Sequence, residues 1–241
     1  MGFKQKENPH SHRIVRDYMK INEIINRLEE PYDTMCRIQW ETACRSGAVH
    51  KMKFNINLSD PKNSFIIKAI KEKKFNADVI TSNQDSFWKN NDLCFVLLEE
   101  KRGKVLERVI TPELYDWLVN WKEERLRDIK NKLDLHYNFH KKISIRRMNN
   151  ILFPLTQRYY NIHLEKTAFS VGIQNFSSHW LRGSKATFLM ENGMSLRKVQ
   201  MQLGHSKSTT TERYSQADIN SEDELKKYLE LTSKSLRKDL I

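Results

Sequence analysis

Residues 178–193 read SHWLRGSKATFLMENG and are the most informative stretch of the chain. Residues 184–191 favour a helix, and Asn192-Gly193 is expected to end it. His179 and Arg182 are three residues apart, so on a helix they share one face and both side chains can contact a single anion. Such a pair alone occurs by chance in many proteins, so the residues that follow have to be read with it.

The second informative segment, residues 202–214, reads QLGHSKSTTTERY. Residues 195–203 predict a helix that ends at Gly204, because glycine readily reverses the chain at a helix C-terminus. That reversal can present His205 beside the same anion. Tyr214 follows nine residues after His205.

Helical periodicity dominates the rest of the chain. Three further stretches with an amphipathic or capped helical pattern lie at residues 14–28, 111–121 and 222–240. Residues 93–98 and 105–110 instead predict the two strands of a β-hairpin around a basic turn, Lys101-Arg102-Gly103-Lys104. The pattern of residues 59–87 permits either a helix starting at Asp60-Pro61 or a strand starting at Phe65. We therefore expect a mainly α fold with a small antiparallel β-sheet.

The composition favours a polyanionic partner. The 241 residues carry a formal net charge of +12, and the sequence pI is about 9.5. The longest apolar run, residues 93–98, is far shorter than the roughly 20 residues of a membrane-spanning helix. No signal peptide is visible at the amino terminus, and Cys36, Cys44 and Cys94 form no CxxC pair, so we expect a cytoplasmic protein that binds no membrane.

The ordered set of His179, Arg182, Leu203-Gly204-His205 and Tyr214 resembles the second sequence box of the tyrosine recombinase family, which includes phage integrases. The interval of 23 residues from Arg182 to His205 is similar to that of family members. The resemblance implies the fold of tyrosine recombinase catalytic domains, which is the fold of DNA breaking and rejoining enzymes. It also implies duplex DNA as the substrate.

The family's first arginine stands in a Thr-Gly-x-Arg segment, with an acidic residue three positions later. Residues 42–45 read TACR here, so Arg45 is the matching candidate, with Ala43 in place of the usual Gly and Ala48 in place of the usual acid. The loss of that carboxylate removes a group that would orient a neighbouring side chain.

The family's catalytic lysine lies in the turn of a β-hairpin, and the turn at residues 101–104 resembles the family's turn. This resemblance selects Lys101. Lys104 is one alternative, and Lys71 is another if residues 65–80 form the hairpin instead.

The resemblance assigns a role to each of these side chains. Tyr214 attacks a DNA phosphate, which leaves a 3′-phosphotyrosine and a free 5′-hydroxyl. Two guanidinium groups and one histidine donate to the phosphate, the other histidine, His179, bonds the phosphate or accepts the tyrosine proton, and a lysine protonates the leaving oxygen. The expected catalytic set is Arg45, Lys101, His179, Arg182, His205 and Tyr214. No ATP is expected, because the tyrosyl ester stores the energy of the broken strand for resealing. No metal or other cofactor is expected either, because no set of side chains is spaced as a metal cage.

The resemblance also predicts how the chain is organised. Residues 1–220 are expected to form the catalytic domain, with a possible insertion at 59–87, and residues 221–241 a helical tail. Too few residues precede Tyr18 for the family's amino-terminal DNA-clamping domain, so either the protein is minimal or that part is omitted. Four subunits are expected on two DNA sites, with a monomer or dimer when free. The tail either covers its own domain or docks on a neighbouring subunit.

Two other functions remain open. A type IB topoisomerase-like enzyme would use the same cleavage chemistry without exchanging partner strands. A DNA-binding regulator with a decayed active site is suggested by Ala43 and Ala48.

Overall fold

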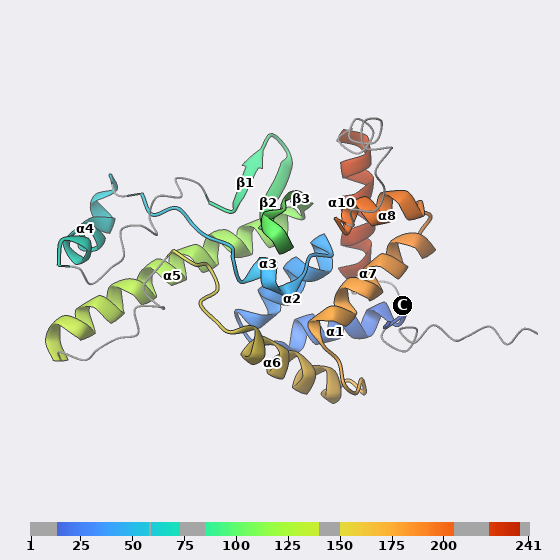
Figure 1. Cartoon of the computed structure of the whole chain (residues 1–241), viewed down its shortest axis with the longest axis horizontal. Coiled ribbons are helices and arrows are strands. Elements are labelled where there is room, and N and C mark those ends of the chain that lie inside the picture. The colour runs from blue at the N-terminus through green and yellow to red at the C-terminus, as the bar shows by residue number, and fades with distance from the viewer. Residues whose placement is uncertain (1–13, 58, 73–84, 140–149, 205–221, 237–241) are drawn as a thin grey trace, which may run out of the picture. The chain divides into compact units, whose positions relative to one another are not determined.

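The computed structural model describes residues 14–57, 59–72, 85–139, 150–204 and 222–236 (Figure 1). Its contacts divide the chain into two compact units. Residues Met1–Ser46 and Arg158–Ile241 form the first, called here the helical unit, and Gly47–Gln157 form the second, the hairpin unit. No described helix is long and apolar enough to cross a membrane.

The helical unit is assembled around a central helix, α2. Its helices are α1 (Tyr18–Arg27), α2 (Tyr32–Thr42), α6 (Gln157–Ser170), α7 (Ser178–Glu191), α8 (Leu196–Gln202) and α10 (Glu222–Leu236), and the short α3 (Ser46–Val49) begins at its boundary. Helix α2 contacts α1 and α7, α10 contacts α1, and α8 contacts α7. The predicted helices at 14–28, 195–203 and 222–240 are thereby confirmed within a few residues, except that residues 237–241 lie outside the described part. The helix predicted at 184–191 is confirmed at its end but begins earlier, at Ser178.

Helix α2 carries no pattern that predicts a helix, because almost every side chain on it is buried. The polar residues among them are paired inside the unit. Arg37 Nε lies 3.0 Å from Glu41 Oε1, and Gln39 accepts a hydrogen bond of 2.7 Å from the hydroxyl of Tyr160. A helix buried on all sides shows no polar face, so its sequence lacks amphipathic periodicity.

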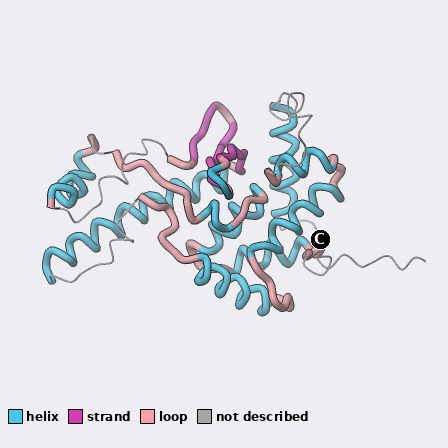
Figure 2. The backbone as a smooth tube through the Cα atoms, viewed as in Figure 1, coloured by secondary structure: helices cyan, strands magenta, loops and turns pink. Residues whose placement is uncertain are grey.

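The hairpin unit contains the sheet. Strands β1 (Phe87–Asn90), β2 (Leu93–Glu99) and β3 (Val105–Ile110) form an antiparallel sheet in the order β1-β2-β3, with Val96 opposite Phe87 and Arg108. Figure 2 shows how small a part of the described chain is strand. The predicted hairpin is confirmed, and β1 is an additional strand.

Two helical segments complete this unit. Helix α5 (Pro112–Phe139) contacts β1 and β2, and its start at Pro112 agrees with the prediction. The 3-10 helix η2 (Pro61–Asn63) leads into α4 (Ser64–Lys71), which contacts α5. The Asp60 side chain accepts a 2.9 Å bond from the backbone N–H of Lys62, so the helical alternative applies to the start of segment 59–87. The prediction of a mainly α fold with a small antiparallel sheet is confirmed.

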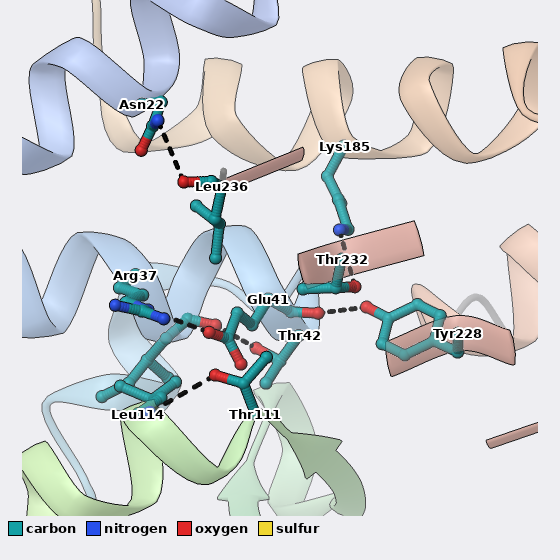
Figure 3. Close-up of polar contacts among 11 residues, drawn as sticks. Asn22, Arg37, Glu41, Thr42, Thr111, Leu114, Lys185, Tyr228, Thr232 and Leu236 are labelled. Carbon is teal, nitrogen blue, oxygen red and sulfur yellow. Dashed lines mark hydrogen bonds and ion pairs between the residues drawn. The ribbon is translucent and has the colours of Figure 1, made fainter. Parts of the chain in front are cut away.

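The tail helix α10 packs against its own helical unit (Figure 3). The hydroxyl of Tyr228 donates to the backbone carbonyl of Glu41, and the side-chain amide of Asn22 donates to the carbonyl of Leu236 at 3.1 Å. Lys185 of α7 donates to the Thr232 hydroxyl at 3.0 Å.

Lys185 is fully buried in an aromatic cage. Its ammonium nitrogen lies 5.0 Å from the ring centre of Trp40, 5.1 Å from that of Phe188 and 5.4 Å from that of Tyr228. Burial lowers the pKa of Lys185 to about 7, and nearby Glu41 opposes part of this effect. The ordinary pKa of an unfolded lysine is about 10.4.

We expect Lys185→Met to stabilise the protein at pH 6. Between pH 7 and 10 the unfolded chain holds a proton on Lys185 that the folded chain releases, so the wild-type free energy of unfolding rises with pH. Below pH 7 both states are protonated, and the folded state bears the full cost of the buried charge. Met removes that cost but loses the bond to Thr232, so we expect a net gain of about 2 to 4 kcal/mol at pH 6.

The measurement is urea unfolding of both proteins from pH 6 to pH 10. The gain is expected to shrink as pH rises towards 10. Lys166→Met, at an exposed position on α6, is the matched control and should change stability little at any pH. A gain from Lys185→Met that stays constant with pH would show that Lys185 does not titrate in this range.

Candidate active site

Arg182 joins three segments of the helical unit. It is buried on α7, where its Nη1 donates a 2.7 Å hydrogen bond to the carbonyl of Ala43 and its Nη2 donates to the carbonyl of Leu203. Ala43 stands two residues before Arg45, and Leu203 two residues before His205. One guanidinium therefore connects α7 with the segment of the first expected arginine and with the segment that leads to His205.

The two carbonyls are available because each lies at the end of a helix. Ala43 is the C-cap of α2 and Leu203 is the C-cap of α8. The last carbonyls of a helix have no partner within it and carry the negative end of the helix dipole. A buried cation between two helix C-termini is thus stabilised by both. A guanidinium has five N–H donors, so one side chain can bond both carbonyls at once.

Ala43 has a left-handed backbone, with φ 53° and ψ 25°. Glycine adopts this conformation at little cost, whereas a residue with a Cβ is disfavoured there by roughly 1 kcal/mol or more. Ala43 nevertheless makes the turn and presents its carbonyl to Arg182. The replacement of the usual Gly therefore leaves this part of the site geometry intact.

A second contact joins the segment that carries Arg45 to the segment that carries His179. The hydroxyls of Ser46 and Ser178, both buried, are 3.3 Å apart, and these residues directly neighbour Arg45 and His179 in sequence. Arg45 is half-buried and follows α2. His179 is exposed in the first turn of α7, on the same helix as Arg182. The structure thus brings together the backbone segments of three expected site residues.

The candidate lysines belong to the other unit. Lys101 and Lys104 are exposed at the β2–β3 turn, where Arg102 and Gly103 have positive φ values of 62° and 71°. The amide of Glu100 donates a 2.7 Å bond to the Lys104 carbonyl and closes the turn. The choice between Lys101 and Lys104 stays a prediction.

Lys71 is the last residue of α4. The alternative hairpin over residues 65–80 is wrong for residues 65–71, because the apolar residues of this stretch bury one face of a helix rather than alternating across a strand. Lys71 therefore loses the hairpin context that made it a candidate.

His205 and Tyr214 lie outside the described residues. The described segment before them ends at Gly204, whose φ of 63° is the left-handed value expected where glycine ends a helix. Their expected roles remain predictions.

The carbonyls of Ala43 and Leu203 are partners that sequence patterns did not indicate. Every residue has a carbonyl, so no residue type marks the ones that accept from Arg182. Two features of the sequence could have indicated these carbonyls. One is the helix end predicted at Gly204, and the other is the position of the family's usual Gly, which Ala43 occupies.

The sequence matches the model of the phage integrase family over residues 15–221. The chain therefore belongs to this family. It is similar to a tyrosine recombinase XerD of Lacticaseibacillus casei, with 37% identity over 109 residues, which are 44% of this chain and 33% of that protein. It is also similar to a tyrosine recombinase XerC of Bifidobacterium longum (strain DJO10A), with 38% identity over 65 residues, which are 27% of this chain and 18% of that protein.

Among solved structures, the XerH site-specific recombinase bound to difH substrate in a pre-cleavage complex has a TM-score of 0.49 and 20% identity to this chain. The match covers 81% of this chain and 47% of that one. The chain thus spans less than half the length of the proteins it matches.

Proposed function

We propose that this chain is a tyrosine-type site-specific recombinase that cuts and rejoins duplex DNA through a covalent bond to Tyr214. The observation that carries the proposal is the position of Arg182, whose guanidinium is bonded to the carbonyls two residues before Arg45 and two residues before His205. Membership of the phage integrase family supports the same reading.

In the proposed reaction the Tyr214 oxygen forms a bond to the scissile phosphorus, and the bond from phosphorus to the 5′ oxygen breaks. Arg45 and Arg182 donate hydrogen bonds to the nonbridging oxygens, whose negative charge grows in the transition state, and His205 adds a further donor. His179 bonds the phosphate or accepts the tyrosine proton. The 5′-hydroxyl of the partner strand then attacks the phosphotyrosine and restores a DNA phosphodiester.

The phosphotyrosine ester conserves the energy of the broken strand, so the proposal includes neither ATP nor a metal. Replacement of one preorganised donor to a developing anion typically costs about 3 to 4 kcal/mol of barrier. The two guanidinium groups are therefore expected to supply a large share of the catalysis.

The test is to trap the intermediate on a nicked suicide duplex, in which the released 5′-end is lost by diffusion. An active enzyme accumulates a covalent protein–DNA adduct, and peptide mass spectrometry is expected to locate the nucleotide on Tyr214. A protein that shifts DNA on a gel but never forms an adduct would be the decayed regulator. Relaxation of a supercoiled plasmid lacking any specific site would favour the topoisomerase-like alternative.

The alternative of a DNA-binding regulator with a decayed active site was suggested by Ala43 and Ala48. Ala43 retains the left-handed turn and the bond from Arg182, and Ala48 is buried at 2% exposure, as a small apolar side chain should be. The bond from Arg182 to Ala43 favours a working site, whereas the burial of Ala48 does not distinguish the two alternatives.

We propose Lys101 as the general acid. Lys101→Ala is expected to slow cleavage on the order of a hundredfold, since the 5′ oxygen would leave without a proton. A substrate with sulfur in place of that oxygen should restore the rate, because a thiol has a reference pKa of only about 8.5 and departs as a thiolate. Lys104→Ala is the matched control on the same turn. Rescue of Lys104→Ala but not of Lys101→Ala would transfer the role to Lys104.

The proposed assembly is a tetramer on two DNA sites, with a monomer or dimer in the absence of DNA. Exchange of the tail between subunits would require the bonds of α10 to Asn22, Glu41 and Lys185 to break and form again on a neighbour. We propose that the packed α10 represents the free protein, and that residues 1–220 act as the catalytic domain.

A further inference from the structure

Helix α7 is joined to the segment 43–46 at two points, both within the helical unit. One is the 2.7 Å bond from Arg182 to the Ala43 carbonyl. The other is made by Ser178, four residues earlier on the same face of α7, whose hydroxyl donates to the Ser46 hydroxyl at 3.3 Å. Ser178 is 1% and Ser46 3% exposed, so this bond is shielded from water. The proposed cleavage reaction gives these two hydroxyls no role.

The two contacts enclose two of the proposed catalytic residues. On α7 His179 lies between them in sequence, and on the other segment Arg45 lies between them. One contact alone would let the segments pivot about it, whereas two contacts fix the direction of one segment relative to the other. The four contacting residues are buried, while Arg45 is half-buried and His179 is exposed. The backbone that carries both side chains is therefore held from inside the unit.

Helix α6 also contacts both segments. The hydroxyl of Tyr160 donates to Gln39 at 2.7 Å, and Gln39 in turn donates to the carbonyl of Cys44 at 3.3 Å. The next residue of α6, Asn161, accepts a 3.3 Å bond from the backbone N–H of Ser178. The first N–H groups of a helix have no partner within it, so this bond anchors the start of α7. In each segment the anchored residue directly precedes a proposed catalytic side chain.

The hydroxyl bond lies close to a group that the sequence lacks. Ala48 stands three positions after Arg45, where the tyrosine recombinase family has an acidic residue. A methyl side chain has no polar atom with which to orient a neighbour. Ser46, directly after Arg45, has such an atom, and its hydroxyl bonds the segment that carries His179.

We propose that Ser46 and Ser178 are positioning residues, and that their hydroxyl bond fixes the direction of Arg45 relative to His179 at the scissile phosphate. The inference rests on the proposed function, because it takes a DNA phosphate as the group that both side chains contact. Neither serine is proposed to touch the substrate. Each acts through the catalytic residue that follows or precedes it in sequence.

The test is single-turnover cleavage of the suicide duplex by Ser46→Ala and Ser178→Ala. A catalytic group displaced by about 1 Å can cost a hundredfold in rate, and here the bond of Arg182 still limits the displacement. We therefore expect each variant to cleave roughly tenfold more slowly at saturating DNA. The DNA concentration at half-saturation should stay within about twofold of the wild-type value, since no group that binds DNA is removed.

Ser184→Ala is the matched control on the same helix. Ser184 is fully buried, and its hydroxyl accepts a 2.9 Å bond from the backbone N–H of Val15, in a segment without a candidate catalytic residue. The control should lower Tm about as much as the two test variants, because it also leaves a buried group without its bond. Its cleavage rate should equal that of the wild-type protein.

Two double variants test whether the serines act as a pair and through Arg45. S46A/S178A removes both hydroxyls, so neither is left facing an apolar group, and this variant should fold at least as well as either single one. It should cleave no more slowly than the single variants, because only one bond is lost. In protein that already carries Arg45→Ala, the further change Ser46→Ala should slow cleavage less than about twofold.

Wild-type cleavage rates in the two single variants and in S46A/S178A would overturn the proposal and leave the recombinase standing. An equal slowing in Ser184→Ala would also overturn it, because the loss would then follow from general destabilisation. So would losses that multiply in S46A/S178A, since the two hydroxyls would then act separately. Absence of an adduct from the wild-type protein itself would reject the recombinase and the positioning role together.

Discussion

Replacing Tyr214 with Phe is expected to abolish the covalent protein–DNA adduct while leaving DNA affinity within about twofold. Phe keeps the aromatic ring and removes only the oxygen that forms the ester, so no weaker reaction can substitute for it. The expected loss of cleavage is complete within the sensitivity of the suicide-substrate assay.

The structure shows why three of the described tyrosines are poor substitutes. The hydroxyl of Tyr228 donates to the carbonyl of Glu41, and that of Tyr160 donates to Gln39 at 2.7 Å. Burial raises the pKa of Tyr160 well above its ordinary value, and burial together with the bond to Glu191 raises that of Tyr18. A raised pKa disfavours the phenolate that attacks phosphorus.

Tyr159→Phe is the matched control, because Tyr159 is 59% exposed on α6 and is the described tyrosine most open to solvent. It should form the adduct at the wild-type rate. Persistence of the adduct in Tyr214→Phe, or its loss in Tyr159→Phe, would identify a different nucleophile. Gel-shift titration of each variant separates a failure to cleave from a failure to bind.

Replacing Arg182 with Ala is expected to have the second largest effect, because it acts on both catalysis and stability. Loss of one donor to the developing charge should slow cleavage on the order of 10² to 10³-fold. The same change leaves the carbonyls of Ala43 and Leu203 without this charged donor, which we expect to destabilise the fold by about 3 to 5 kcal/mol.

Arg182→Lys separates the two effects. Lysine retains the charge but has no planar fork, so it cannot bond two carbonyls and a phosphate together. We expect it to recover part of the stability and little of the cleavage rate. Thermal unfolding and single-turnover cleavage, measured on the same preparations, report the two quantities.

Arg197→Ala, an exposed arginine on α8, is the control for removing a guanidinium near this region. It should cost less than about 0.5 kcal/mol of stability. Arg182→Ala that unfolds at the wild-type temperature would contradict the structural role of the buried guanidinium. Full cleavage by that variant would contradict the catalytic role.

The predicted elements and the missed ones differ in what surrounds them. Helix α1 was predicted because one face lies towards the core and another towards solvent, which leaves a periodic pattern in the sequence. The β2–β3 hairpin was predicted from a short apolar run, a basic turn and a return strand. Helix α2 lacks that pattern because it is buried on all sides, and β1 is only four residues long. The ambiguous stretch at 59–87 became helical at its start through the bond from Lys62 to Asp60.

The amino-acid sequence alone determined the family, the mainly α class with a small sheet, and the order of the candidate residues from Arg45 to Tyr214. These properties depend on residue identity and short-range spacing, which are written directly in the chain. Only the tertiary structure decided that Arg182 is held by the carbonyl of Ala43, 139 residues away, and that Lys185 is enclosed by three aromatic rings. Such contacts join backbone atoms or distant side chains that carry no local signature, so they exist only once the helices have packed.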